Sequence, residues 1–183
     1  RAVVSTSVGN LFFGDAPEYL DYLDRIKDFG SDEVIAIAYQ EDDPLSLESL
    51  EQLENIQQAL AQHPEIKRTN SLLDLERIQD VDGTLYVDQY AELARESPET
   101  RGQLVTEIKD DSLLKGRAFS NSGNHALVLI ELKVDPDRSG EVAPSIATDI
   151  RTIFSNNGYE HAQRHEAGFP AVMAEMIHQT YFS

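Results

Sequence analysis

An acidic stretch late in the chain has the residue types and spacing that open a calcium-binding loop. It reads Asp-Pro-Asp-Arg-Ser-Gly at 135–140, with oxygen ligands at alternate positions and a glycine at the sixth. A twelve-residue calcium loop also needs a two-oxygen glutamate at its last position, which here is Ile146. The run Asp-Val-Asp-Gly at 80–83 is a weaker match. We therefore expect an acidic turn between a strand and a helix at 135–140, and leave ion binding there open.

Histidines near the end of the chain could also ligate a metal. His161 and His165 lie four residues apart beside Glu166, but this spacing brings two imidazoles together only on a helix. We expect a strand here, which separates them by roughly 13 Å on one face. A structural or surface role is favoured, although ion binding again stays open. His125, directly before a strong strand, is expected to be a turn residue.

The chain carries no signature of nucleophilic or phosphate chemistry. It has neither a Gly-x-Ser-x-Gly turn nor a Gly-x-x-x-x-Gly-Lys loop. It has no cysteine, which excludes disulfides, thiolate metal sites and cysteine nucleophiles. We expect no enzymatic activity, no catalytic residue, no cofactor and no metal.

The charge of the chain limits its partners. Thirty-three acidic and 15 basic side chains give a formal charge of −18 over 183 residues. Such a surface repels phosphate backbones and anionic head groups, so nucleic acid is excluded as a partner. The longest apolar runs, 34–39 and 126–130, are far shorter than the roughly 20 residues of a membrane helix. The length is typical of one domain.

Two copies of a strand, helix and strand pattern organise the chain. The first copy begins with a strand at 34–39 that is apolar on both faces. Leucines and an isoleucine then recur every three or four residues from Leu47 to Leu60, which predicts a helix. The charged segment 66–70 is expected to be an edge strand. Ser46 or Asp43 can cap that helix. The second copy has a strand at 125–134, a helix beginning near Pro144 and closed by Asn-Asn-Gly at 156–158, and a last strand at 159–166.

The sequence between the two copies reads as helical and irregular. A weak helix is expected at 88–95, and Ser97 and Pro98 have the residue types that cap and open a second helix. A short strand at 116–120 and the turn-rich tetrapeptide 121–124 then form a hairpin with the strand at 125–134. Helices are also expected at about 17–29 and, with an apolar face, from 169 to the end.

These patterns predict an α+β domain with a ferredoxin-like split β-α-β plan. Two β-α-β halves would close one antiparallel sheet with both helices on one face. We expect a single domain, 1–183, built from five parts in chain order. They are a leading segment and helix (1–33), a first β-α-β half (34–73), a helical insertion (74–116), a second half (117–167) and a final helix (168–183).

Several short motifs resemble one family in the right order. They are Phe-Phe-Gly-Asp (12–15), Phe-Gly-Ser-Asp-Glu (29–33), Asp-Pro-Leu-Ser (43–46), Thr-Asn-Ser-Leu (69–72), Leu-Leu-Lys-Gly-Arg-Ala-Phe-Ser (113–120) and Gly-Phe-Pro (168–170). Together they resemble the first large loop of resistance-nodulation-division (RND) superfamily exporters, particularly the MMPL-type lipid exporters.

The resemblance implies a porter subdomain on the extracytoplasmic (periplasmic) face of the inner membrane. Its expected partners are the rest of the parent transporter, meaning the membrane helices and a second porter loop, and a hydrophobic or lipid-like substrate. The fragment would line part of the substrate route, and the aromatic and methionine residues near its ends are the expected route residues: Phe12, Phe13, Phe169 and Met173. Core packing is the competing explanation for these four side chains.

Three other interpretations stay open. The chain could be an extracytoplasmic ligand-binding or protein-binding sensor of the same fold, or a small acidic enzyme, although no catalytic set supports the latter. The apolar face within 169–181 could also mediate a homo-oligomer. The substrate, the direction of transport and the oligomeric state of the parent are not determined by the sequence.

Overall fold

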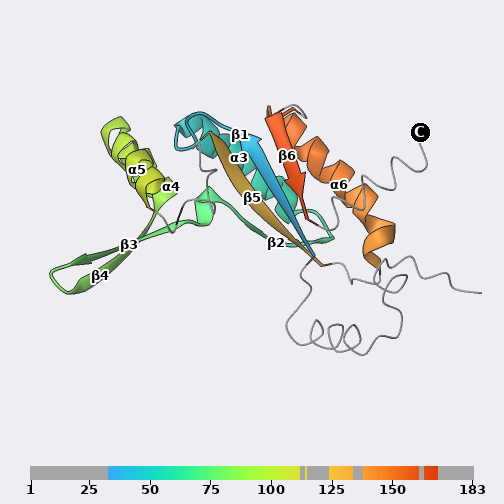
Figure 1. The fold of residues 1–183 in the computed structure, drawn as a ribbon, viewed down its shortest axis with the longest axis horizontal. Helices are drawn as coiled ribbons and strands as arrows, with labels where there is room; N and C mark the ends of the chain where they lie inside the picture. Colours follow the sequence, from blue (N-terminus) through green and yellow to red (C-terminus); the bar gives the residue numbers. More distant parts are fainter. Residues whose placement is uncertain (1–32, 112–113, 115–123, 134–137, 161–162, 169–183) are drawn as a thin grey trace, which may run out of the picture.

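The computed structural model describes residues 33–111, 114, 124–133, 138–160 and 163–168, and they form an α+β structure with antiparallel sheets. In chain order the elements are β1 (Val34–Gln40), α3 (Leu47–Ala61), β2 (Ile66–Asn70), the 3₁₀ turn η1 (Leu72–Asp74), β3 (Glu76–Val81), β4 (Thr84–Gln89), α4 (Tyr90–Glu96), α5 (Pro98–Asp110), β5 (His125–Leu132), α6 (Ser139–Asn156) and β6 (Arg164–Ala167) (Figure 1).

Four strands form the main sheet in the order β2-β5-β1-β6, and every neighbouring pair is antiparallel. β1 lies between β5 and β6, which confirms the predicted buried central strand. β2 ends the sheet, as its charged sequence predicted. A register shift between Ile66 and Arg68 marks an irregularity in this edge strand.

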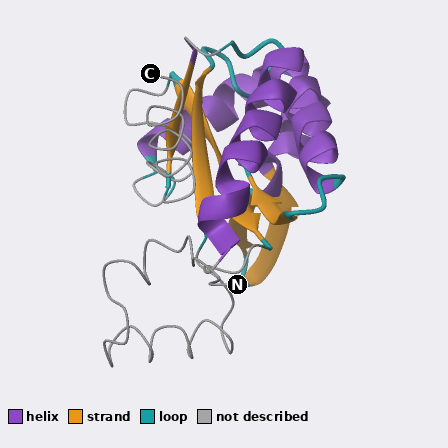
Figure 2. Ribbon diagram, turned by 90° about the vertical axis from the view of Figure 1, so that its right-hand side faces the viewer, coloured by secondary structure: helices purple, strands orange, loops and turns teal. Residues whose placement is uncertain are grey.

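One face of the sheet and the helices enclose the core. Burial alternates along β1, where Ile35, Ile37 and Tyr39 are buried, and the same alternation runs along β5. These side chains pack with the apolar stripes of α3 and α6, and Figure 2 shows the helices gathered mainly on one side of the strands. Ser46 caps α3, because its hydroxyl accepts the backbone N–H of Ser49. α3 and its cap were therefore predicted correctly, except that Leu47, the first residue of the predicted apolar stripe, is 51% exposed.

The second half differs from the prediction at both ends of its helix. α6 begins at Ser139, so Pro144 lies inside the helix and not at its start. The helix closes as expected at Gly158, whose φ is 92°. The backbone N–H of Tyr159 then bonds the carbonyl of Phe154, so Tyr159 belongs to the helix end. The predicted strand at 159–166 is therefore shorter and later, at Arg164–Ala167.

The helical insertion predicted at 74–116 is wrong in its first part. Residues 76–89 form the β3–β4 hairpin, which extends away from the main sheet in Figure 1. Its two-residue turn is Asp82-Gly83, with φ angles of 54° and 81°, the geometry that this dipeptide favours between antiparallel strands. The acidic run 80–83 is thus a hairpin turn. α4 and α5 follow, and Ser97 caps α5 with Pro98 in its first turn, as predicted.

The start of β1 and the end of β6 lie at the same end of the sheet. Val34 opens β1, and Gly168 follows the last residue of the antiparallel neighbour β6. The approach is so close that a Cβ on Gly168 would lie 2.1 Å from the carbonyl oxygen of Val34. The predicted helices at 17–29 and 169–183, and the strand at 116–120, lie outside the described residues.

None of the helices within the described ranges is long and apolar enough to cross a lipid bilayer.

Candidate functional site

The four predicted route residues, Phe12, Phe13, Phe169 and Met173, lie outside the described residues. Their role stays a prediction. His161 and residues 135–137, the first half of the acidic loop, also lie outside, whereas Ser139 and Gly140 belong to α6 and not to the predicted turn. The described surface must therefore be searched for other features that could bind a ligand or partner.

The sheet face opposite the core is apolar across its two central strands. Because side chains alternate, this face receives every second residue of β1 and β5. Leu129 is 37% exposed, while Leu127 and Ala36 are half-buried. We call this surface the open face, and its apolar centre comprises Val34, Ala36, Ala38, Leu127 and Leu129. Chemically, it suits contact with apolar groups.

A charged cluster borders the open face at the end where β1 begins. Glu131 pairs with Val34 in the register and forms ion pairs with Lys67 (2.5 Å) and Arg68 (2.8 Å) of β2. The hydrogen bond from Lys67, together with that from Arg68, holds the pKa of Glu131 below its ordinary value. This end of the open face is therefore polar, and its carboxylate is already neutralised.

Two histidines border the open face at the opposite end. His125 pairs with Gln40 and His165 pairs with Ala38, which brings the imidazole centroids to 5.6 Å. His125 Nδ1 also lies 3.0 Å from Oδ1 of Asn124. His125 is the first residue of β5, as the predicted strand at 125–134 has it, and is not a turn residue. Sequence reasoning missed this pair because its members are far apart in the chain.

The structure separates the side chains of His165 and Glu166, which the sequence analysis considered together as possible metal ligands. His165 lies on the open face, whereas Glu166 points to α6 and binds Arg151. Adjacent strand residues point to opposite faces, so the two side chains cannot share one ion. Among the described residues, no group of three or more His, Asp or Glu side chains is placed to hold a metal.

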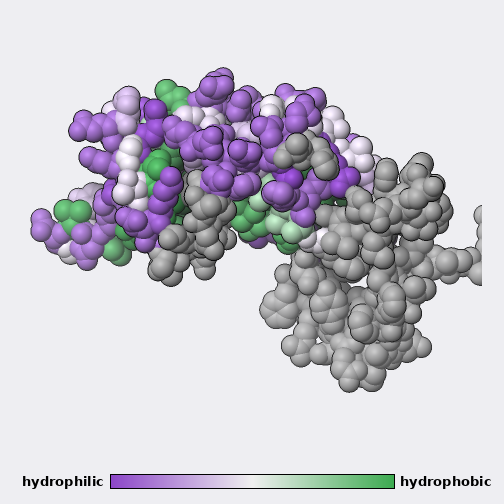
Figure 3. Space-filling model, turned by 45° about the horizontal axis from the view of Figure 1, so that its top comes forward, coloured by the Kyte–Doolittle hydropathy of each residue, from purple (hydrophilic) through white to green (hydrophobic). Residues whose placement is uncertain are grey.

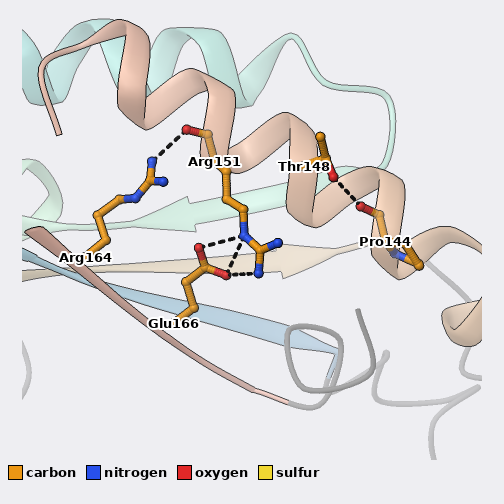
Figure 4. Close-up of polar contacts among 5 residues, drawn as sticks. All are labelled: Pro144, Thr148, Arg151, Arg164 and Glu166. Atoms are coloured by element: carbon orange, nitrogen blue, oxygen red, sulfur yellow. Dashed lines mark hydrogen bonds and ion pairs between the residues drawn. The ribbon is translucent and has the colours of Figure 1, made fainter. Parts of the chain in front are cut away.

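A second polar cluster fastens the edge strand β6 to α6 (Figure 4). Arg151 binds both carboxylate oxygens of Glu166, with Nε at 3.0 Å from each and Nη2 at 2.8 Å from Oε2. Arg164 reaches the same helix and donates to the backbone carbonyl of Arg151 at 2.6 Å. Burial lowers the pKa of the Arg164 guanidinium. These contacts hold the short strand β6 against α6, although the buried Nε of Arg164 has no hydrogen-bond partner among the described residues.

A third polar cluster holds the base of the β3–β4 hairpin. Arg77 of β3 donates to both carboxylate oxygens of Glu107 on α5, from Nε at 2.8 Å and from Nη2 at 2.6 Å. The hydroxyl of Tyr90 donates to the same carboxylate at 2.9 Å. Burial and this hydrogen bond raise the pKa of Tyr90 to about 12. The hairpin base is thus tied to the helices by a network that the sequence pattern did not predict.

A shallow apolar depression lies between the start of α3 and α5. Its lining residues are Pro44, Leu45, Val105, Ile108 and Lys109, and it leaves room for about one water molecule. It is far smaller than a small-molecule site, and its apolar surface offers no group to orient a ligand. The open face is therefore the better candidate for an apolar ligand or neighbour.

The comparisons with known proteins return no family model, no curated protein and no solved structure that matches this chain.

Proposed function

We propose that this chain is an extracytoplasmic porter subdomain of a proton-driven RND-type or MMPL-type exporter of hydrophobic or lipid-like substrates. The domain lies on the periplasmic face of the inner membrane, between two membrane helices of its parent. It lines part of the substrate route and moves against a second porter loop as the transport cycle proceeds. The fold that we assign to it is the ferredoxin-like split β-α-β plan.

The strand order supports this fold assignment. In that plan the first and third strands lie in the centre, and the fourth and second strands lie outside them. The main sheet has β5 and β1 in the centre, with β2 and β6 outside, and all its neighbours are antiparallel. Each half connects its strands through one long helix, α3 or α6, and the β3–β4 hairpin with α4 and α5 is an insertion between the halves.

The observation that carries the proposal is that β1 and β6, neighbours in the main sheet, place Val34 and Gly168 next to each other. Gly168 lies against the backbone of Val34, with a hypothetical Cβ only 2.1 Å from the Val34 carbonyl oxygen. This proximity suits a domain inserted between two neighbouring membrane helices, because both of its connections then return towards one membrane. The motif order that resembles the first porter loop gives independent support.

The open face supports the proposed contact with substrate or with a second loop. Its centre is apolar over two strands, while Glu131 and the two histidines limit it at either end. An apolar surface with polar borders suits a lipid-like ligand or a packed protein neighbour. The charge of −18 suits a water-facing exterior for the rest of the domain.

The location is tested by cysteine labelling of the intact parent protein. This chain has no cysteine, so Gln58→Cys on the exposed face of α3 supplies a single thiol in the domain once other cysteines of the parent are removed. A membrane-impermeant maleimide should label it in cells whose outer membrane alone is permeabilised. Labelling that requires disruption of the inner membrane would refute the periplasmic location.

The route is tested by export assays on the intact parent. Leu127→Asp and Leu129→Asp place a carboxylate in the apolar centre of the open face, and Gln58→Asp adds the same charge elsewhere. We expect export to fall at least about tenfold for the first two at normal expression, because burying an unpaired carboxylate is costly. Export equal to that of the Gln58→Asp control would count against the open face. A parent without membrane spans on both sides of this domain would favour the sensor interpretation.

A further inference from the structure

The β3–β4 hairpin concentrates exposed apolar side chains. Of the seven large hydrophobic residues that are exposed in the described part of the chain, five lie in this hairpin: Ile78, Val81, Leu85, Tyr86 and Val87. Leu85 is 69% exposed and Ile78 is 66% exposed. Figure 3 shows hydrophobic surface among hydrophilic surface at the left end of the molecule, where the hairpin lies. Clustered exposure of this kind marks an interaction surface.

The hairpin register gathers three of these side chains on one face. Ile78 pairs with Val87, and Asp80 pairs with Leu85, so Ile78, Leu85 and Val87 point the same way. Arg77 belongs to the opposite face, where it binds Glu107 of α5. The apolar face of the hairpin therefore points away from α5. We call Ile78, Leu85 and Val87 the arm face.

The hairpin holds its shape without help from a partner. An isolated two-stranded hairpin is marginally stable at best. Here the tip is closed by the Asp82-Gly83 turn, and the N–H of Gly83 donates to the Asp80 side chain at 2.8 Å. The base is tied to the helices by Arg77 and Glu107, with Tyr90 joined to the same carboxylate. A surface ordered beforehand loses little conformational entropy on binding.

We propose that the β3–β4 hairpin is a docking arm whose arm face packs into an apolar groove, bordered by Lys and Arg side chains, on a protein other than a second copy of this chain. The proposal stands apart from the export function, since the partner can belong to any assembly that this domain joins.

Charge determines the choice of partner. Residues 76–89 carry four carboxylates and one guanidinium, that of Arg77, which is already engaged by Glu107. Glu76 and Asp80 lie two residues before and after Ile78 on β3, so their carboxylates are on the same face of the hairpin as Ile78 and flank it. A groove with a basic border would complement this pattern.

The same charges disfavour the other occupants of the arm face. A second copy would bring its own carboxylates, in a chain of charge −18, against those of the first. An anionic membrane surface would repel the arm. Insertion into hydrocarbon would also bury the carboxylates of Asp80 and Asp82 at the tip, which is unfavourable.

The experiment is photocrosslinking in the intact parent protein, in cells. A benzophenone amino acid replaces Leu85, whose high exposure means that the substitution leaves the core unaltered. The matched control carries it at Gln58 on the exposed face of α3. We expect a protein adduct at position 85 above the control, and mass spectrometry should map it to an apolar segment flanked by Lys or Arg.

Charge reversal sharpens the test. Glu76→Lys should lower the adduct yield about threefold or more, because it places a cation against the basic border, whereas Glu51→Lys on α3 should leave it unchanged. Three outcomes would overturn the proposal: no adduct above the Gln58 control, lipid adducts alone, or adducts between two tagged copies of this chain. An equal effect of both reversals would also overturn it. Normal export with no adduct would remove this inference and leave the proposed function intact.

Discussion

Arg77 on the hairpin and Glu107 on α5 form a two-point ion pair that connects elements thirty residues apart, with N–O distances of 2.6 and 2.8 Å. The hydrogen bond from Arg77 is the main reason that the pKa of Glu107 lies below its ordinary value of 4.5. Because Arg77 lies on β3, this pair makes the position of an exposed hairpin depend on a helix of the domain.

Glu107→Gln should lower the free energy of unfolding at pH 7 by about 1 kcal/mol. This is the typical contribution of a charge-assisted hydrogen bond, reduced because the pair is partly exposed to solvent. The pKa of Glu107 is depressed on folding, so its stabilisation is present above pH 4.5 and is lost as the pH falls through the folded value. The difference between wild type and variant should therefore shrink below pH 4.5. Urea unfolding at several pH values measures it, with the exposed Glu51→Gln as control. A difference independent of pH would contradict the ion-pair explanation.

Gly168 and Gly102 should respond to alanine in opposite directions. At Gly168 the φ of 114° and the close Val34 carbonyl leave no room for a Cβ, so β6 must shift from β1 and stability should fall by at least about 2 kcal/mol. Gly102 lies in α5 with no neighbour within 4 Å of a new Cβ. Alanine there should raise stability by about 0.5–1 kcal/mol through helix propensity. Thermal unfolding of the two variants side by side is the measurement, and equal shifts would show that the close approach is not maintained.

Tyr159→Phe should destabilise the fold while its ring packing is kept. The ring lies 4.5 Å from that of Tyr39, and the hydroxyl donates to Glu41 at 2.8 Å and lies 3.0 Å from Oε1 of Gln52. Loss of the hydroxyl should cost about 1 kcal/mol at pH 7.

The same tyrosine gives a pH test of that contact. Burial raises the pKa of Tyr159 above its ordinary 10.0, so its contribution is complete below pH 10 and is lost at higher pH. Chemical unfolding at pH 7 and pH 11 should show a smaller gap between wild type and Tyr159→Phe at the higher pH. A gap that widens at pH 11 would contradict this sign.

Pro144→Ala should stabilise α6. Pro144 lies inside the helix, so it supplies no backbone N–H for the carbonyl one turn earlier, an interior penalty of about 3 kcal/mol. The looser unfolded chain of the alanine variant offsets part of the gain, so we expect a net increase of about 1–2 kcal/mol. Its own carbonyl keeps the bond from the Thr148 hydroxyl, at 2.8 Å (Figure 4). Unfolding in urea, followed at 222 nm, measures the change. A destabilised variant would mean that the proline fits its site without cost.

The elements with strong local signals were predicted from the sequence alone. The apolar stripe from Leu50 to Leu60 and the cap at Ser46 determine α3, and Ser97 with Pro98 determines the start of α5. β1 and β5 are long β-branched and aliphatic runs, and the charged β2 could only be an edge. These signals lie within a few residues of each other, because capping and periodic burial are local effects.

The β3–β4 hairpin was missed because its apolar residues lie on both faces and show no clear alternation. Ile78 and Leu85 share one face, but Tyr86 lies on the other, and all three are exposed. The signal for a hairpin is the Asp82-Gly83 turn between two β-rich runs, although residues 80–83 also match the opening of a calcium loop weakly. The predicted last strand began too early. The backbone N–H of Tyr159 bonds Phe154 at the end of α6, so Tyr159 is not part of β6.

The chain's sequence determined the α+β character of the fold, the main helices and the acidic, cysteine-free composition. Tertiary structure alone decided which residues meet: His125 beside His165, Arg77 on Glu107 and Gly168 against Val34. The reason is that periodicity and capping act between residues close in sequence. Strand register, in contrast, joins residues far apart, and a slip of one residue would exchange the two faces of every strand.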